Sequence, residues 1–397
     1  MKYSYDRSEI KKISLSGFLS MVSVRNKRIA AAPDDLPVSE FNANRLAKSL
    51  HPAVQHVKIA KVEEHTEAKS FTLVPDKERG TESLAYFRAS QYVSVNLNIN
   101  GTALSKPYTI RSGPGSALGE DGTSYVLTIK LTRPGFASQW ILENWKEGDR
   151  VDISGPLGDF YYDRIRDAGT VVALAGGSGI TPFYSMAEAI ADGIEDFRLT
   201  ILYGSRTAEG ILLKDELDEV IARAGGKVKV VHVLSDEARE GYEHGFLTAE
   251  LVKKYAPEGD YSVFMCGPQA MYDYEEQELK KLGLPRRRIR RELSGDWLMS
   301  EPSARSYKLP LDVQGYRRTV DCLENESLEW AIERAGIKAP THCRSGECGW
   351  CHARLVSGEV FVPEQADGRR AADLKFGWVH PCASFPRSDV ELEIFPG

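Results

Sequence analysis

The chain has 397 residues, 42% of them hydrophobic, and a formal net charge of -6 at pH 7. This length predicts two to four domains with ordinary globular cores, and the acidic balance argues against a nucleic-acid-binding protein, whose binding domain is normally basic. A membrane-spanning helix needs about 18 apolar residues. The best candidate, residues 15–24, is too short, contains serines and lacks the cleavage site of a signal peptide. We therefore expect no transmembrane segment and no nucleic-acid partner.

Residues 1–52 form an N-terminal extension whose sequence indicates no chemical task. Within it, residues 40–50 are predicted to form a short helix that ends before Pro52. The favoured interpretation is an arm that packs over a neighbouring domain. The alternative is an amphipathic element that docks a partner or a membrane surface, which the short apolar run and its small basic flank support less well.

Residues 53–163 change to an alternation of apolar and polar residues, clearest at 57–62, 70–74 and 92–99. Short alternating strands separated by turn residues predict an antiparallel β-barrel. Three local motifs lie inside this region, and each is weak when taken alone. They are Lys106-Pro107-Tyr108-Thr109-Ile110, Gly135-Phe136-Ala137-Ser138 and Gly155-Pro156-Leu157-Gly158-Asp159-Phe160.

Residues 164–294 open with a continuous apolar strand at 170–175, of the kind buried in parallel sheets. The strand runs into Gly176-Gly177-Ser178-Gly179-Ile180-Thr181-Pro182, and a helix is predicted from there to about residue 192. Glycines let a backbone approach a pyrophosphate, Thr181 is a candidate N-cap, and Pro182 suits the first helical position. The motif is not the G-x-G-x-x-G fingerprint, and a glycine turn without a ligand is the alternative. Further strands at 198–203, 227–234 and 261–265 predict an α/β domain with a parallel sheet.

The end of this domain carries two features with more than one interpretation. The last strand ends at Cys266-Gly267-Pro268, and a cysteine at the end of an apolar strand usually packs in a core. The basic run at 286–291 is predicted to form a loop and a short strand that close the domain; such runs are mostly solvated, and docking of an acidic partner is the less favoured alternative. Residues 295–306 read as an interdomain linker because they contain glycine, proline and several serines.

Five of the six cysteines lie within residues 307–397, and four of these are Cys343, Cys348, Cys351 and Cys382. The spacing C-x4-C-x2-C with one distant cysteine is the known ligand pattern of a plant-type [2Fe-2S] cluster, so these four are the predicted metal ligands. A structural zinc site is an alternative, but it normally pairs two C-x2-C units or adds histidines at fixed spacing. The second alternative is a group of free thiols that happen to lie close together. Few cysteines remain for disulfides, which favours a reducing cytoplasm.

The residues around these cysteines predict a small α+β domain. Strands are expected at 308–313, 316–322, 353–357 and 390–395, with a helix at 327–335. Gly346 and Gly349 suit a loop that bends sharply and offers N-H donors to charged sulfur. The flanking histidines, His342, His352 and His380, are expected to pack and to form hydrogen bonds, because four cysteines already complete a ligand set.

Together and in this order, the motifs resemble the ferredoxin-NADP reductase superfamily. Residues 54–397 resemble its single-chain flavin reductases with a C-terminal plant-type ferredoxin domain, the type that serves as the reductase component of oxygenases. The resemblance implies FAD, a [2Fe-2S] cluster and NADH or NADPH as cofactors. It places Tyr108 against the flavin ring, Thr109 near flavin N5 and Ser138 at the pyrophosphate. The usual arginine of the family is Lys106 here, and lysine supplies charge without a bidentate fork.

The same resemblance implies the nucleotide site. Cys266 would lie beside the nicotinamide and position it without acting as a nucleophile. Arg206 would lie where relatives contact the adenosine end, and it either binds a 2'-phosphate, which would mean NADPH, or faces solvent; NADH is slightly favoured. The implied catalytic residues are Tyr108, Thr109 and Cys266. The implied cofactor-binding residues are Lys106, Pro107, Tyr108, Thr109, Lys130, Gly135, Ala137, Ser138, Gly176, Gly177, Gly179, Thr181, Pro182, Arg206, Cys266, Gly267 and Pro268.

These parts imply an NAD(P)H:acceptor oxidoreductase. Hydride electrons would pass through FAD and the cluster, one at a time, to an external protein such as an oxygenase or another reductase. Two alternatives stay open: the same relay run in reverse, from a low-potential donor to NAD(P)+, and a redox-sensing binding module. The sequence predicts neither the identity of the acceptor nor the oligomeric state.

Overall fold

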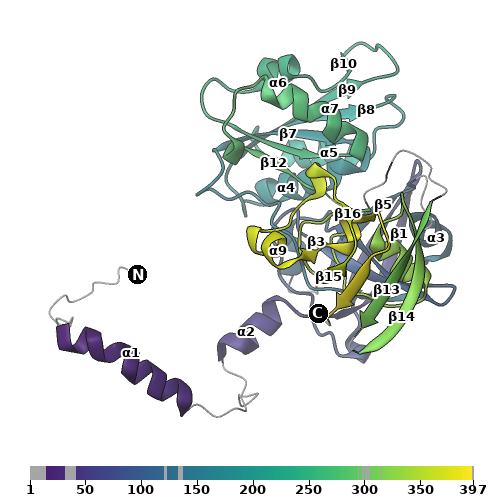
Figure 1. The fold of residues 1–397 in the computed structure, drawn as a ribbon. Coiled ribbons are helices and arrows are strands. Elements are labelled where there is room, and N and C mark those ends of the chain that lie inside the picture. The colour runs from purple at the N-terminus through teal and green to yellow at the C-terminus, as the bar shows by residue number, and fades with distance from the viewer. Residues whose placement is uncertain are drawn as a thin grey trace. The chain divides into compact units, whose positions relative to one another are not determined.

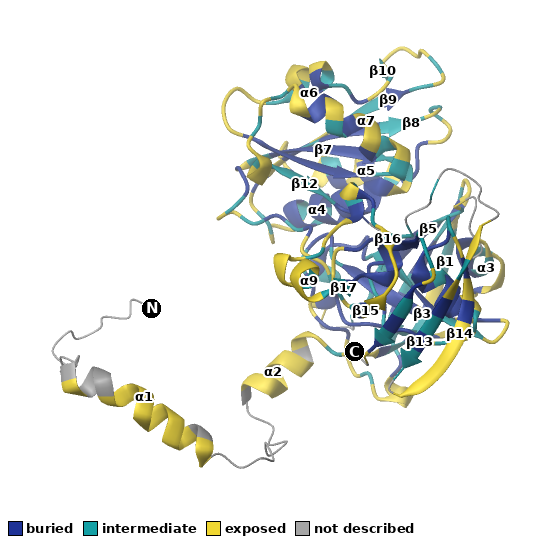
Figure 2. Ribbon diagram, in the orientation of Figure 1, coloured by how far each residue is buried: buried dark blue, intermediate teal, exposed yellow. Residues whose placement is uncertain are grey.

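The computed structural model describes residues 15–31, 42–119, 123–132, 137–293, 295–296, 299, 305–313 and 315–395 (Figure 1). It divides into two units, Met1–Lys48 and Ser49–Gly397, which are treated separately. The N-terminal part holds α1 (Leu15–Ala30), which was not predicted, and α2 (Asn42–Leu50), which corresponds to the predicted helix at 40–50. Most described side chains of both helices are exposed (Figure 2). None of the helices within the described ranges is long and apolar enough to span a membrane.

An antiparallel sheet of six strands forms the first part of the larger unit, in the order β4-β3-β6-β1-β2-β5. Ile110, directly after β4, bridges to Leu127 in β5, so the two ends of the sheet approach each other and the sheet curls into a half-barrel. This confirms the predicted antiparallel barrel architecture. Its elements are β1 (Gln55–His65), β2 (Ala68–Pro75), β3 (Tyr92–Ile99), β4 (Thr102–Thr109), β5 (Tyr125–Lys130), α3 (Ala137–Asn144) and β6 (Arg150–Ile153).

A parallel sheet forms the second part, in the order β10-β9-β8-β7-β11-β12, as the apolar strands predicted. Residues of β7 alternate between two cores: Val171 and Ala173 pack with α4 and α5, while Val172 and Leu174 pack with α6 and α7. Both faces of the sheet are therefore covered. The elements are β7 (Thr170–Gly176), α4 (Thr181–Ala191), β8 (Arg198–Ser205), α5 (Lys214–Arg223), β9 (Val228–Leu234), β10 (Glu243–His244), α6 (Ala249–Tyr255), β11 (Ser262–Cys266), α7 (Gln269–Lys280) and β12 (Ile289–Arg291).

The basic run forms the predicted loop and short strand, as a 3-10 turn at Arg286–Arg288 followed by β12. The side chains of Arg288 and Arg290 are only 14% and 11% exposed. Arg290 donates hydrogen bonds to the backbone carbonyls of Asp159 and Tyr161. Arg288 donates to the backbone oxygen of Arg166. The interpretation of this run as a solvated face is therefore wrong for these two arginines.

The last part is the predicted α+β domain, with a five-stranded sheet in the order β14-β13-β19-β15-β17 and a separate pair, β16 with β18. Leu309, Ile332 and Leu392 belong to its apolar core. Ser327 caps α8 by accepting a hydrogen bond from the Trp330 amide at 3.3 Å. The elements are β13 (Ser306–Val313), β14 (Tyr316–Leu323), α8 (Leu328–Arg334), β15 (Ala353–Ser357), β16 (Val360–Phe361), α9 (Ala371–Phe376), β17 (Trp378–Val379), β18 (Phe385–Pro386) and β19 (Glu391–Ile394).

Short 3-10 helices connect several of these elements. They are η2 (Lys77–Arg79), η3 (Pro114–Ala117), η4 (Gly177–Ile180), η5 (Arg286–Arg288), η6 (Glu364–Ala366) and η7 (Pro381–Ala383).

Candidate functional site

The structure brings the four predicted metal ligands together. Cys343, Cys348 and Cys351 lie in the loop between α8 and β15, and Cys382 lies in η7. Sulfur contacts run from Cys348 to Cys343, from Cys343 to Cys382, and from Cys382 to Cys351, the last at 3.4 Å. All six cysteines of the chain are free thiols. Four thiols that face one another without forming a disulfide are a donor set suited to an iron-sulfur cluster.

The loop backbone supplies the hydrogen bonds that charged sulfur needs. The amides of Ser345 and Cys348 donate to Cys343 Sγ, and the amide of Trp350 donates to Cys348 Sγ, each at 3.4 Å. Hydrogen bonds from the Cys348 and Cys382 thiols hold the pKa of Cys343 below its ordinary value. Gly346 has φ +84°, and a Cβ there would lie 2.1 Å from the carbonyl oxygen of Ala366, so glycine is required at this bend.

The two predicted nucleotide motifs meet at the carboxyl edge of the parallel sheet. β7 and β11 are neighbouring strands, with Ala175 opposite Cys266, and the chain leaves them in opposite directions across the sheet. Such a switch in strand order is where open α/β sheets bind ligands. A Cβ on Gly179 would lie 2.1 Å from the carbonyl oxygen of Cys266, so only glycine permits this contact. The arrangement fits a nucleotide laid between the glycine loop and the Cys266 loop.

Thr181 does not have the predicted capping role. The residue before α4 is Ile180, which is already helical at φ -69° and ψ -26°, and the Thr181 hydroxyl donates to the carbonyl oxygen of Ser178 at 3.0 Å. The reason is that η4 leads directly into α4, so the chain makes no extended N-cap before Thr181. Pro182, predicted at the first helical position, is the second residue of α4 and lies in its first turn.

A buried acid, Glu292, lies beside Cys266 and was missed by sequence reasoning. Burial, then the charge of Glu292, raises the pKa of the Cys266 thiol. Burial also raises the pKa of Glu292 well above its ordinary value, with Glu347 as the next cause. The Tyr272 hydroxyl accepts from the Gly267 amide at 3.1 Å and donates to the backbone oxygen of Glu292. The region around Cys266 therefore holds a neutral thiol, consistent with a positioning role and not with a nucleophile.

Arg206, predicted at the adenosine end, follows directly after β8. Its side chain is 87% exposed, and its Nε lies 3.1 Å from a carboxylate oxygen of Asp236. Its contact with a nucleotide stays a prediction.

The predicted flavin residues Lys106, Pro107, Tyr108 and Thr109 lie at the end of β4, paired with β3. Among the described residues, neither the Tyr108 nor the Thr109 hydroxyl has a hydrogen-bond partner, and both side chains are half-buried. Burial raises the pKa of Tyr108, so its phenol is neutral. A half-buried strand end that carries two unpaired hydroxyls is a suitable surface for the flavin ring to pack against.

The predicted phosphate residues have partners within the protein. Lys106 Nζ forms an ion pair with Asp296, and Ser138, in the first turn of α3, accepts from the Thr132 amide at 3.1 Å. Ala137 begins α3 and Lys130 ends β5, while Gly135 lies outside the described residues. The contacts of these residues with a flavin phosphate stay predictions.

The cysteine loop lies directly against the strands that carry the flavin residues. Ser105 Oγ on β4 donates to the carbonyl oxygen of Thr341 at 2.8 Å. Tyr92, on β3 opposite Thr109, has its pKa raised first by burial and then by the charges of Cys343 and Cys348. Sequence reasoning missed Tyr92, because its place between the flavin strands and the cysteines depends on packing between two domains.

Comparison with known proteins agrees with this division into three parts. Residues 57–162 match the oxidoreductase FAD-binding domain family, residues 173–277 the oxidoreductase NAD-binding domain family, and residues 311–387 the 2Fe-2S iron-sulfur cluster binding domain family. The chain is 26% identical over 356 residues to the glycine betaine monooxygenase reductase subunit of Chromohalobacter salexigens, covering 84% of this chain and 93% of the relative.

Two further relatives support the assignment. The chain is 31% identical over 240 residues to NADH-cytochrome b5 reductase 1 of Candida glabrata, covering 56% of this chain and 81% of the relative. The crystal structure of phthalate dioxygenase reductase, described as a modular structure for electron transfer from pyridine nucleotides to [2Fe-2S], matches with a TM-score of 0.61 at 25% identity. It covers 86% of this chain and 98% of that one.

The fold and the three sites define a flavin-dependent oxidoreductase with binding domains for FAD, NAD and a [2Fe-2S] cluster. The chain belongs to the ferredoxin-NADP reductase superfamily, as a single-chain flavin reductase with a C-terminal plant-type ferredoxin domain. It is an NAD(P)H-dependent electron-transfer reductase that passes electrons through FAD and the cluster to an external redox partner.

Proposed function

We propose that this chain is the reductase component of an oxygenase system and that NADH is its electron donor. The support is the printed function of its relatives, which include the glycine betaine monooxygenase reductase subunit. Free thiols throughout, with four of six gathered at one site, support a reducing compartment such as the cytoplasm. We further propose domain limits at 53–163 for FAD, 164–294 for the nucleotide, 295–306 for the linker and 307–397 for the cluster.

The geometry supports the residue roles that we propose. FAD, when bound, accepts a hydride, and the [2Fe-2S] cluster carries single electrons. The loop at Gly176, Gly177 and Gly179 admits the nucleotide to the end of β7, and Cys266 closes the nicotinamide side as a neutral thiol. Tyr108 would lie against the flavin ring, and Thr109 would offer a hydroxyl hydrogen bond at its edge. This apposition supplies the orientation that hydride transfer requires.

The contact between the cysteine loop and β4 carries the proposal. The hydrogen bond from Ser105 to Thr341 joins the strand of Tyr108 and Thr109 to the loop of Cys343 and Cys348. Electrons therefore have a short route from the flavin strand to the ligand sulfurs without leaving the protein. The relay that we propose runs from the nucleotide to the flavin and then to the cluster.

A ligand substitution tests the site. Cys382→Ser should lose iron and the cluster absorption bands while it retains FAD and NADH-dependent reduction of ferricyanide, because the flavin and nucleotide sites lie on other domains. The matched control is Cys322→Ser, since Cys322 is equally buried but lies in the core of the ferredoxin domain. A terminal oxygenase component should be reduced by the wild type and the Cys322→Ser protein but not by Cys382→Ser. Full iron content in Cys382→Ser would refute the ligand assignment.

A further inference from the structure

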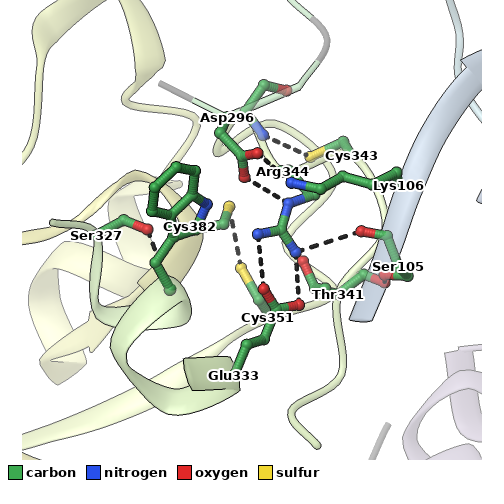
Figure 3. Close-up of polar contacts among 12 residues, drawn as sticks. Ser105, Lys106, Asp296, Ser327, Glu333, Thr341, Cys343, Arg344, Cys351 and Cys382 are labelled. Carbon is green, nitrogen blue, oxygen red and sulfur yellow. Dashed lines mark hydrogen bonds and ion pairs between the residues drawn. The ribbon is translucent and has the colours of Figure 1, made fainter. Parts of the chain in front are cut away.

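Four charged side chains, from the flavin region, the linker and the ferredoxin domain, meet beside the cysteine loop (Figure 3). Lys106 comes from β4, Asp296 from the segment after β12, Glu333 from α8, and Arg344 from the cysteine loop itself. Their side chains are 13%, 16%, 10% and 0% exposed, in that order. We refer to these four residues as the four-charge group.

Arg344 connects the other members. Its Nε donates to one carboxylate oxygen of Asp296, and Lys106 Nζ donates to the other. Its Nη1 and Nη2 form a two-point contact with the carboxylate of Glu333 at 2.7 and 2.8 Å, and Nη1 also reaches the backbone oxygen of Ser105 at 3.3 Å. The planar guanidinium suits such two-point contacts, which a lysine could not make.

The four formal charges sum to zero, and this balance depends on all the parts being in place. Burial opposes the charge on Asp296, but Arg344 and Lys106 outweigh it and hold the pKa of Asp296 well below its ordinary value. A buried charge that loses its partner is strongly destabilising. Loss of the Asp296 charge would leave two buried cations facing one carboxylate.

The four-charge group touches both the flavin strand β4 and the cysteine loop. Lys106 is two residues from Tyr108 on β4, and Arg344 directly follows Cys343. The amide of Gly295 donates to the carbonyl oxygen of Cys343 at 3.3 Å, which places the segment of Asp296 on the same loop. Arg344 has φ +60°, a conformation that a non-glycine residue holds only when its surroundings fix it.

We propose that Asp296, as a positioning residue, joins Lys106 and Arg344 into an ionic clamp that fixes the cysteine loop against β4 and sets the rate of electron transfer from flavin to cluster. The inference rests on the proposed roles of Cys343 and of the end of β4. The carboxylate of Asp296 accepts hydrogen bonds from Lys106 and Arg344, and we infer that it acts through these two cations. The clamp requires Arg344 in particular, because its guanidinium group binds the carboxylates of Asp296 and Glu333 at the same time.

The test is Asp296→Asn in the full-length protein with both cofactors bound. After anaerobic mixing with NADH, flavin bleaching should keep its wild-type rate, while cluster bleaching should slow by about tenfold. This factor corresponds to a modest share of the free energy that is lost when a buried charge pair is broken. Hydrogen exchange in peptides covering 102–109 and 341–351 should become faster. Asp321→Asn is the matched control, since it breaks an exposed pair with Lys308 in the ferredoxin domain, and it should change neither quantity.

Glu333→Gln provides a second variant for the case in which Asp296→Asn loses flavin or iron. It removes a partner of Arg344 within the ferredoxin domain and should slow cluster bleaching less than Asp296→Asn. Unchanged cluster bleaching in a variant with full flavin and iron content would overturn the clamp. A shifted reduction potential of the cluster with unchanged hydrogen exchange would also overturn the clamp. In that case the lost charge alone would explain the slower cluster bleaching. Absence of cluster bleaching in the wild type would instead refute the proposed function.

Discussion

At the scale of single residues, burial decides which acids of this chain stay neutral. Glu275 in α7 is 1% exposed, and its Oε2 has no hydrogen-bond partner among the residues that the structure describes. Burial, followed by the negative charge of Glu278, raises the pKa of Glu275 from 4.5 to about 8. The folded state therefore prefers the protonated acid over a pH range in which the unfolded chain is ionised.

This shift predicts a pH dependence of stability. The contribution of Glu275 is fully present below its unfolded pKa of 4.5 and is lost as the pH rises through about 8. Each pH unit in that window removes up to roughly 1.4 kcal/mol from the free energy of unfolding. Glu275→Gln should flatten this fall, so that its melting temperature near pH 8 equals or exceeds that of the wild type. Gln277→Ala, exposed on the same helix, should keep the wild-type pH dependence; an equally steep fall in Glu275→Gln would contradict the assignment.

The sequence predicts that four cysteines share one site because their spacing is local, and the structure brings their sulfurs together. It does not predict Arg344 as a buried residue. Arg344 reads as a polar loop residue, and its partners Glu333 and Asp296 lie 11 and 48 positions away. The sequence does not reveal the roles of Tyr92 and Glu292 for the same reason, since their surroundings form only when domains or strands pack together.

At the scale of elements, the approach of two loops shapes the nucleotide site. Gly179→Ala would place a methyl group against the backbone of Cys266, which neither loop can accommodate without moving. We expect a loss of at least about 1–3 kcal/mol in the stability of the nucleotide domain and weaker NADH binding, measured by melting temperature and by titration. Gly169→Ala is the matched control, because a Cβ there meets nothing within 4 Å. Equal NADH affinity in the two variants would contradict the predicted role of the glycine loop.

The elements themselves were largely predictable because their apolar periodicity is strong. The strand at 170–175 and the parallel order of its neighbours follow from continuous apolar runs separated by helices. The cap of α4 was predicted wrongly, because the sequence pattern of a threonine before a proline does not reveal the 3-10 turn that precedes it. Helix α1 was missed, since its apolar run is short and it continues through basic residues to Ala30.

At the scale of the whole molecule, residues 1–48 form a unit distinct from the reductase domains. Deletion of residues 1–45 should leave FAD content and ferricyanide reduction by NADH intact, and it should weaken coupling to the protein acceptor. The truncation must retain Pro52, whose carbonyl oxygen accepts from the Gly155 amide at 2.9 Å. The full-length protein is the reference in both assays. Loss of flavin from the truncated protein would show that the extension is structural.

The domain order was predictable because each domain carries its own motif, whereas the docking between domains was not. Contacts such as Ser105 with Thr341 join positions that are 236 residues apart in the chain. No local pattern encodes such a pair. The relay from flavin to cluster therefore depends on the part of the fold that sequence reasoning could not supply.

An anaerobic visible spectrum, recorded before and after stoichiometric NADH and then NADPH, tests the central claim most directly. The account predicts that NADH bleaches both the flavin and the iron-sulfur bands, because the cysteine loop lies directly against the strand that carries the predicted flavin residues. NADPH should act less efficiently. Bleaching of the flavin with a cluster that stays oxidised would contradict the relay from NADH to the cluster.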